Sequence, residues 1–131
     1  MLRVSTNLDP AVEDLIHRVI GCLMEVHKAL GPGLREPIYQ RASALELTAA
    51  NIPFEPEKRF PVIYRGKILY THWVDFVVAE RLIVELKSVD RLHPVHHAQV
   101  RSELKISKLR AALLVNFNVA LLPDGIRRIV L

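Results

Sequence analysis

Trp73–Val89 reads WVDFVVAERLIVELKSV, which is two apolar runs separated by the polar pair Glu80–Arg81. Runs rich in Val, Ile and Phe on either side of a short turn are typical of an antiparallel strand pair. We therefore predict strands over residues 68–78 and 82–89, and a β-sheet at the centre of the fold.

The register of this strand pair brings three polar side chains together. A reversal centred on residue 80 sets Asp75 opposite Glu85. Lys87 lies two residues beyond Glu85, so both point to one face of the sheet, and Leu86 between them points to the other. A carboxylate inside an apolar strand needs a partner or a metal, because burying it alone is costly. The sequence thus predicts a cluster of Asp75, Glu85 and Lys87.

Two carboxylates and a lysine on one face suit phosphodiester hydrolysis. Carboxylate oxygens hold hard divalent cations such as Mg²⁺, and such a metal activates water and stabilises charge at phosphorus. The lysine can position or deprotonate the water, or help to neutralise the phosphate. The alternative is a structural ion-pair network, with Glu85 and Lys87 paired on the surface and Asp75 bound to Arg81 or Lys87.

Two helical patterns precede the sheet. Asp9-Pro10 is typical of an N-cap followed by proline at the first helical position. Apolar residues then recur at three- and four-residue spacing until Gly31, which ends the helix. A second helix is predicted to start near Glu36 and to stop before Pro53. Its apolar stripe is predicted to comprise Ile38, Ala42, Leu45 and Ala49.

The remaining segments complete the sheet. We expect a first strand over residues 60–64, a helix after Pro94 and a buried strand at AALLVNF, residues 111–117. A strand, a helix and a strand in sequence form a crossover, which predicts parallel pairing. A last strand follows the Asp124-Gly125 turn. The predicted fold class is α/β: one domain over residues 1–131, with a mixed central sheet flanked by helices in the order α-α-β-β-β-α-β-β.

Composition limits the classes of protein that fit. The 131 residues carry a net charge of +4 and one cysteine, so an internal disulfide is excluded. No apolar run reaches the roughly 18 residues of a membrane span, and MLRVSTNLDP at the N-terminus lacks the apolar core of a signal peptide. We therefore expect a soluble cytoplasmic protein without a membrane partner. The basic stretch from Lys87 to Arg110 favours a polyanionic partner.

Three blocks of sequence resemble a known family. VDFVVAERLIVELK resembles the D…(D/E)-x-K core of the PD-(D/E)XK nuclease superfamily. GLREPIY carries Gly33, Glu36 and Tyr39 and is similar to the G-x-x-E-x-x-Y signature that names a small prokaryotic family within that superfamily. HAQVRSELKISKLRAALLVNFN resembles the later block of the same family. The resemblance extends over about residues 12–130.

The resemblance implies a single restriction-endonuclease-like domain and a nuclease dependent on Mg²⁺ or Mn²⁺. Asp75, Glu85 and Glu36 would then bind the metal, Lys87 would handle the water, and Gln99 would assist from the following helix. Glu36 has an alternative interpretation, since an acidic residue also complements the dipole at a helix N-terminus. Where relatives tend to have an aromatic residue four positions after the glutamine, this chain has Glu103, which would repel a phosphate backbone unless a cation offsets it.

The expected partner of such a site is nucleic acid, with DNA preferred to RNA. Tyr39 is expected to orient Glu36 or to line the groove, and its alternative is a core aromatic residue. The basic residues expected to follow the phosphates are Arg101, Lys105, Lys108 and Arg110. Two alternatives stay open: a catalytically silent nucleic-acid- or protein-binding module that retains the nuclease fold, and a chain that acts as a homodimer or with an unknown protein partner.

Overall fold

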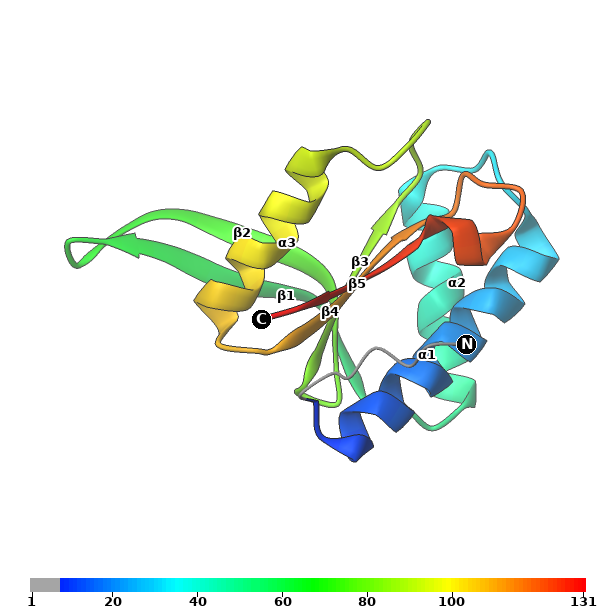
Figure 1. Cartoon of the computed structure of the whole chain (residues 1–131), viewed down its shortest axis with the longest axis horizontal. Coiled ribbons are helices and arrows are strands. Elements are labelled where there is room, and N and C mark those ends of the chain that lie inside the picture. The colour runs from blue at the N-terminus through cyan, green and yellow to red at the C-terminus, as the bar shows by residue number, and fades with distance from the viewer. Residues whose placement is uncertain (1–7) are drawn as a thin grey trace.

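A five-stranded mixed sheet forms the centre of the computed structural model, which describes residues 8–131 (Figure 1). Most of the N-terminal segment that was inspected for a secretory signal lies outside these residues. The elements are, in chain order, α1 (Pro10–Leu30), α2 (Glu36–Ala49), β1 (Phe54–Tyr64), β2 (Lys67–Val78), β3 (Leu82–Lys87), α3 (Pro94–Ser107), β4 (Ala111–Asn116), the 3-10 helix η1 (Leu122–Gly125) and β5 (Ile126–Val130).

The strands lie in the sheet in their chain order, β1-β2-β3-β4-β5. The pairs β1–β2, β2–β3 and β4–β5 are antiparallel, whereas β3 and β4, joined by α3, are parallel. The predicted element order, the antiparallel pair β2–β3 and the parallel crossover are confirmed. The architecture is consistent with the expected restriction-endonuclease-like fold.

The first strand begins earlier than predicted. β1 starts at Phe54 rather than near residue 60, and it contains Pro56 and Pro61. A proline cannot donate to a strand ladder, but β1 is an edge strand, where a missing N–H is tolerated.

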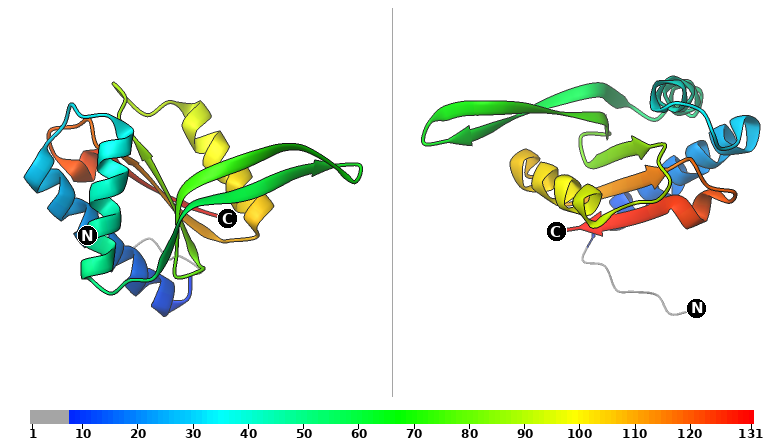
Figure 2. Two further views of the ribbon diagram at one scale, coloured as in Figure 1. Left: turned by 180° about the vertical axis from the view of Figure 1, so that it is seen from behind. Right: turned by 90° about the horizontal axis from the view of Figure 1, so that it is seen from above.

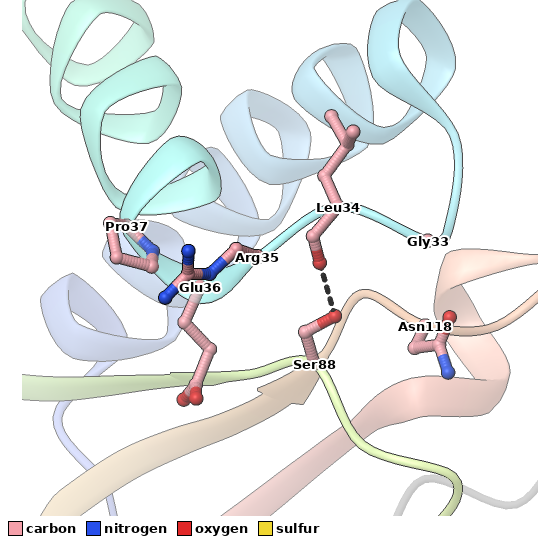
Figure 3. Close-up of a pocket in the computed structure, with 7 residues that line it drawn as sticks. All are labelled: Gly33, Leu34, Arg35, Glu36, Pro37, Ser88 and Asn118. Carbon is pink, nitrogen blue, oxygen red and sulfur yellow. Dashed lines mark hydrogen bonds between the residues drawn. The ribbon is translucent and has the colours of Figure 1, made fainter.

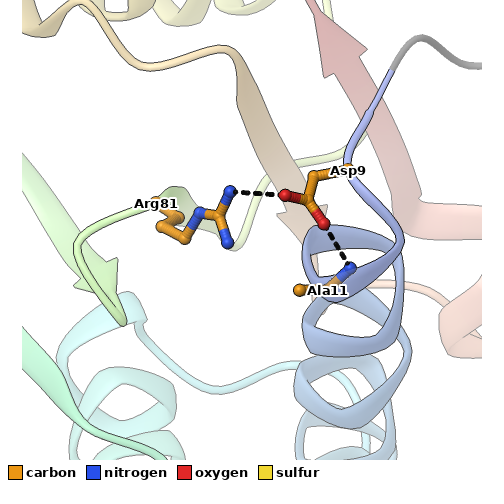
Figure 4. A network of polar contacts seen from close by, with 3 residues as sticks. All are labelled: Asp9, Ala11 and Arg81. Carbon is orange, nitrogen blue, oxygen red and sulfur yellow. Dashed lines mark hydrogen bonds and ion pairs between the residues drawn. The ribbon is translucent and has the colours of Figure 1, made fainter.

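Helix α1 begins where the sequence predicts. The side chain of Asp9 accepts a hydrogen bond from the Ala11 N–H at 2.8 Å, and proline follows it at the first helical position. Asp9 also pairs with Arg81, in the turn between β2 and β3, at 3.3 Å (Figure 4). This contact ties the start of α1 to the turn that brings the two central strands together.

The buried face of α2 differs from the prediction. Its buried residues are Tyr39, Ser43 and Leu47, at four-residue spacing. Ile38 and Leu45 from the predicted stripe are 41% and 73% exposed. The prediction followed hydrophobicity alone, whereas the helix buries an aromatic residue with a polar tip and a small polar residue.

Two apolar clusters cover the two faces of the sheet. One packs α1 and α2 against the sheet, and the other packs Val100 and Leu104 of α3 against it. Figure 1 shows α1 and α2 together at one side and α3 at the other. Consecutive residues of β3 alternate between the clusters, with Ile83 toward α3 and Leu86 toward α1 and α2.

The β1–β2 hairpin extends beyond the helices, as both views in Figure 2 show. None of the helices in the described part of the chain is long and apolar enough to span a membrane.

Candidate active site

Strands β2 and β3 separate at Asp75. Regular pairing joins Phe76 to Val84 and continues toward the turn. Beyond this pair, side-chain carboxylates accept the backbone N–H groups of the opposite strand. The Asp75 N–H donates to Glu85 Oε1 at 2.8 Å, and the Leu86 N–H donates to Asp75 Oδ2 at 2.8 Å. The structure thus places Asp75 beside Glu85, as the predicted register requires.

These reciprocal hydrogen bonds hold both carboxylates in fixed positions. Each carboxylate uses one oxygen for a backbone N–H, and within residues 8–131 the other oxygens, Asp75 Oδ1 and Glu85 Oε2, accept no hydrogen bond. Two adjacent carboxylate oxygens of this kind are the ligands that hard divalent cations prefer.

Lys87 shares the face of Glu85. Leu86 between them is buried against α1 and α2, so Glu85 and Lys87 point toward α3. The structure shows no ion pair within 4 Å between Lys87 and any carboxylate of residues 8–131, and Arg81 pairs with Asp9 instead of Asp75. The ion pairs of the structural alternative are therefore not formed.

Burial raises the pKa values of both carboxyl groups. The pKa of Glu85 rises to about 9, because burial and then the negative charges of Glu103 and Asp75 disfavour ionisation. The pKa of Asp75 rises to about 6, mainly by burial and despite the hydrogen bond from Leu86. The Lys87 ammonium lowers both pKa values only in part. A bound cation would restore the ionised form of these groups.

Glu103 is a third acidic residue at this site, and the sequence interpretation gave it no role. It lies on α3 at 2% exposure, between the buried residues Val100 and Leu104. Burial raises its pKa to about 7, Lys87 lowers it and Asp75 raises it. The signal was present, since position 103 falls on the same helical stripe as Val100 and Leu104.

Gln99 lies one turn before Glu103 on the same helix. It is exposed, whereas Glu103 is buried. The helix therefore directs the glutamate toward the sheet and leaves the glutamine at the surface.

Glu57 is a second acidic residue that the prediction missed. It lies on β1 between Pro56, which pairs with Phe76, and Lys58, which pairs with Val74. This position is across from Asp75, and the negative charge of Glu57 helps to raise the pKa of Asp75. Glu57 was missed because the first strand was predicted to start at residue 60.

The turn before α2 positions Glu36. Gly31 and Gly33 have φ angles of 68° and 99°, which glycine adopts without strain. The Tyr39 hydroxyl donates to the Gly31 carbonyl at 2.6 Å and accepts from the Leu34 N–H at 3.1 Å. The Ser88 hydroxyl donates to the Leu34 carbonyl at 2.5 Å, which fastens the turn just beyond the end of β3.

Glu36 lies at an open pocket beside this turn. The pocket is lined by Gly33, Leu34, Arg35, Glu36, Pro37, Ser88 and Asn118, and the Glu36 side chain points from α2 toward the sheet (Figure 3). Its negative charge contributes to the raised pKa of Asp75. The structure thus brings Glu36 to the rim of the site, exposed to solvent.

Tyr39 does not line a groove. It is 0% exposed, and its ring stacks on Phe117 with 4.4 Å between centroids. The expectation that Tyr39 contacts nucleic acid is therefore wrong, because no part of the side chain reaches the surface. Tyr39 is instead a core aromatic residue, as the alternative interpretation had it. Its hydroxyl holds the turn that presents Glu36.

Asn116 holds the segment that follows Lys87. It is buried at the end of β4, where Oδ1 accepts from the N–H groups of Val89 and Asn118 and Nδ2 donates to the Val89 carbonyl. The Phe117 N–H also donates to the Lys87 carbonyl at 2.9 Å. Asn116 therefore has a structural role at the end of the parallel strand pair.

The predicted phosphate contacts are spread along and beyond α3. Arg101, Lys105 and Lys108 are exposed. Arg110 is exposed too, but its guanidinium donates twice to the Leu131 carbonyl at 3.2 Å. The first three are available to a polyanion, whereas Arg110 also anchors the C-terminal strand.

The donor set fits a divalent cation in its chemistry, although a complete cage is not formed. Among residues 8–131, no three His, Cys, Asp or Glu side chains lie close enough together to hold a metal ion. Asp75 and Glu85 offer two free oxygens, and Glu36 lies at the rim. The residues therefore suit a hard cation that keeps several waters, as Mg²⁺ does.

The sequence also matches a family model. The model of the PD-(D/E)XK nuclease superfamily matches residues 13–129. Neither the search of curated proteins nor that of solved structures found a significant match to the chain.

Proposed function

Because the chain belongs to the PD-(D/E)XK nuclease superfamily, we propose that it is a divalent-metal-dependent nuclease that hydrolyses phosphodiester bonds in DNA. One observation carries the proposal: two half-buried carboxylates, Asp75 and Glu85, are held side by side through reciprocal hydrogen bonds to backbone N–H groups. A structural role alone gives no reason to bury two acids together without a cation.

Each residue has a role that follows from its place. Asp75 and Glu85 would hold the metal, and Glu36 would supply a third carboxylate from the rim. The metal, when bound, lowers the pKa of a coordinated water and stabilises charge on the phosphate. Lys87, on the face of Glu85, favours the ionised carboxylates, and its amine can orient the water or neutralise a phosphate oxygen.

The turn before α2 supports placing the chain among proteins with the G-x-x-E-x-x-Y signature. Gly33 supplies the positive φ, Tyr39 holds the turn through its hydroxyl, and Glu36 is presented between them. The spacing of the signature thus has a physical reason in this chain.

DNA is the proposed substrate because the surface near the site is basic. The net charge is +4, and the exposed Arg101, Lys105 and Lys108 lie on or just after α3, the helix that carries Glu103. Contacts of this kind position a phosphate backbone without reading bases.

The test is a titration of purified wild type and Glu85→Ala with Mg²⁺ and Mn²⁺ by calorimetry, followed by incubation with plasmid and single-stranded DNA. We expect the wild type to bind metal and to cut, and Glu85→Ala to do neither. Glu25→Ala, at an exposed position of α1, is the matched control and should behave as wild type.

The opposite result is equally informative. If the wild type binds no divalent metal even with DNA present, the nuclease proposal fails and the silent binding module takes its place.

A further inference from the structure

The part of the β1–β2 hairpin that extends beyond the helices carries an unusual surface. We call residues 58–74 the hairpin arm. Phe60 and Val74 at its base pack in the cluster under α3, and Figures 1 and 2 show the far part of the hairpin extending away from the rest of the molecule. Six large hydrophobic side chains on it are between 48% and 67% exposed, namely Ile63, Tyr64, Ile68, Leu69, Tyr70 and Trp73. Exposed apolar surface gathered on one element indicates a binding surface.

The charges of the arm have a single sign. Residues 58–74 contain Lys58, Arg59, Arg65 and Lys67 and no Asp or Glu. Lys58 pairs with Glu55 at 2.9 Å, just before the arm. Arg59, Arg65 and Lys67 form no ion pair with any of residues 8–131. The arm is therefore complementary to a polyanion.

Cations and aromatic rings alternate along the arm. The Arg59 guanidinium lies 3.9 Å from the centroid of the Trp73 ring, and the Arg65 guanidinium lies 5.6 Å from that of Tyr64. Proteins bind single-stranded nucleic acid by combining aromatic rings, which stack on bases, with basic side chains, which contact phosphates. A duplex keeps its bases stacked on one another and offers no base face to such rings.

The arm leads directly into the candidate active site. Val74 ends the arm, and Asp75 follows it on β2. A strand lying along the arm would therefore reach the position of Asp75 and Glu85.

We propose that the hairpin arm binds unpaired nucleotides of the substrate, so that the substrate class is single-stranded DNA or DNA with a single-stranded region. This inference rests on the proposed nuclease function and adds the form of the nucleic acid. Tyr64, Tyr70 and Trp73 stack on bases, and Arg59, Arg65 and Lys67 contact phosphates.

A second copy of the chain suits the arm less well. The free edge of the hairpin is β1, and Pro56 and Pro61 remove two N–H groups that an added strand would need. A twofold contact between two arms would place basic residues against basic residues, without an acidic residue of the arm to offset them.

The experiment uses Trp73, which is the only tryptophan of the chain. The full-length protein, in chelator to prevent cleavage, is titrated with a labelled oligothymidylate and with the same strand annealed to its complement. Anisotropy of the label gives the affinity, and Trp73 fluorescence reports stacking. We expect quenching at saturation with the single strand, little change with the duplex, and tighter binding of the single strand.

Variants separate stacking from charge. Tyr70→Ala with Trp73→Ala should weaken single-strand binding by about thirtyfold or more, because each of the two stacked bases contributes at least about fivefold. Arg65→Gln with Lys67→Gln should lower the slope of log affinity against log salt by about 1.4, since two phosphate contacts are lost. Leu45→Ala and Arg41→Gln, at exposed positions of α2, are the matched controls and should change neither quantity.

Two results would overturn the proposal: Trp73 emission that is unchanged at saturation, or arm variants that bind like the controls. Sedimentation of the wild type as a dimer that Trp73→Ala dissociates would also overturn it, because the arm would then be occupied by a second copy. Glu85→Ala separates this proposal from the proposed function, because it should abolish cleavage and keep the quenching. A wild-type protein that binds the single strand but does not cut it when Mg²⁺ or Mn²⁺ is present refutes the nuclease and leaves the arm assignment intact.

Discussion

Glu85 and Asp75 stand where the backbone pairing of β2 and β3 would otherwise continue. Each carboxylate accepts the N–H of a residue on the opposite strand, so these backbone N–H groups keep a hydrogen-bond partner while two half-buried acids lie side by side. Without a cation, the pKa of the Glu85 carboxyl group is raised to about 9, so the group stays protonated at neutral pH. The residues that would bind a metal therefore make the metal-free chain sensitive to pH.

We predict that metal-free protein loses stability as the pH rises from near 4.5 toward 9. Glu85 has an ordinary pKa of 4.5 when unfolded and a pKa of about 9 when folded, so the folded state binds the extra proton between these values. Stability falls with pH wherever the folded state binds more protons. Asp75 acts in the same direction between its ordinary pKa of 3.8 and about 6. Thermal unfolding in chelator across this range measures the effect.

Glu85→Gln is the variant that isolates the contribution of Glu85 to this pH dependence of stability. Glutamine mimics the protonated carboxyl group and does not titrate, so its unfolding temperature should decline much less with pH. Glu25→Gln, on the exposed face of α1, should keep the wild-type decline. A wild-type unfolding temperature that stays level or rises across the range would show that Glu85 is ionised in the folded chain.

Tyr39 acts on the site through the turn that it holds. We predict that Tyr39→Phe lowers the free energy of unfolding by about 1–3 kcal/mol, because the Gly31 carbonyl and the Leu34 N–H lose their partner. Activity should fall further than stability explains, since the turn presents Glu36. Chemical unfolding and cleavage rates measure the two effects. Leu45→Ala, at an exposed position of the same helix, is the control, and equal losses in both variants would contradict this role.

At the scale of elements, local patterns predicted most of the fold. The run of β-branched residues interrupted at Glu80–Arg81 fixed both the strands and the register, because a short antiparallel turn leaves few ways to pair them. That register alone placed Asp75 beside Glu85. Helix α1 was equally well marked by its cap and by its terminal glycine.

The predictions were wrong where tertiary packing, and not the local sequence pattern, determines the position of a residue. Pro56 and Pro61 are acceptable in β1 because it lies at the edge of the sheet. The first strand was predicted to start six residues too late, at residue 60, so Glu57 was missed.

Tyr39 was expected to orient Glu36 or to line the groove because it follows Glu36 by one helical turn, with a core aromatic residue as the alternative. Its hydroxyl is instead satisfied inside the protein, by the Gly31 carbonyl and the Leu34 N–H. The burial of Glu103 depends on which face α3 turns to the sheet.

Asn116 joins the parallel strands at the end where Lys87 lies. We predict that Asn116→Ala costs about 1–3 kcal/mol of stability, because the N–H groups of Val89 and Asn118 lose their acceptor in a partly buried position. Cleavage should also weaken, as the segment after Lys87 loses its anchor. Chemical unfolding and single-turnover rates check both effects.

The neighbouring asparagine is the control for this change. The Asn118 side chain donates one longer hydrogen bond, at 3.3 Å to the Val89 carbonyl, so Asn118→Ala should cost less. If Asn118→Ala is the more damaging variant, the anchor lies in the loop and not at the end of β4.

The whole molecule combines a basic exterior with acids gathered at one place. The net charge is +4, yet Asp75, Glu85 and Glu103 are brought together between the sheet and α3, and their repulsion opposes folding. A cation at this place would relieve that repulsion, so metal binding and global stability should be linked.

We therefore predict that Mn²⁺ raises the unfolding temperature, and does so more strongly as the pH rises, because protons compete with the metal for Glu85. At a metal concentration of about 100 times the dissociation constant, the gain is about 2.7 kcal/mol, or roughly 10 °C for a chain of this size. Thermal scans with and without Mn²⁺, below and above neutral pH, measure the shift. Glu85→Ala should abolish it and Glu25→Ala should keep it. An equal shift in both variants would place the metal elsewhere on the surface, and a shift that shrinks with rising pH would mean that its ligands are not these carboxylates.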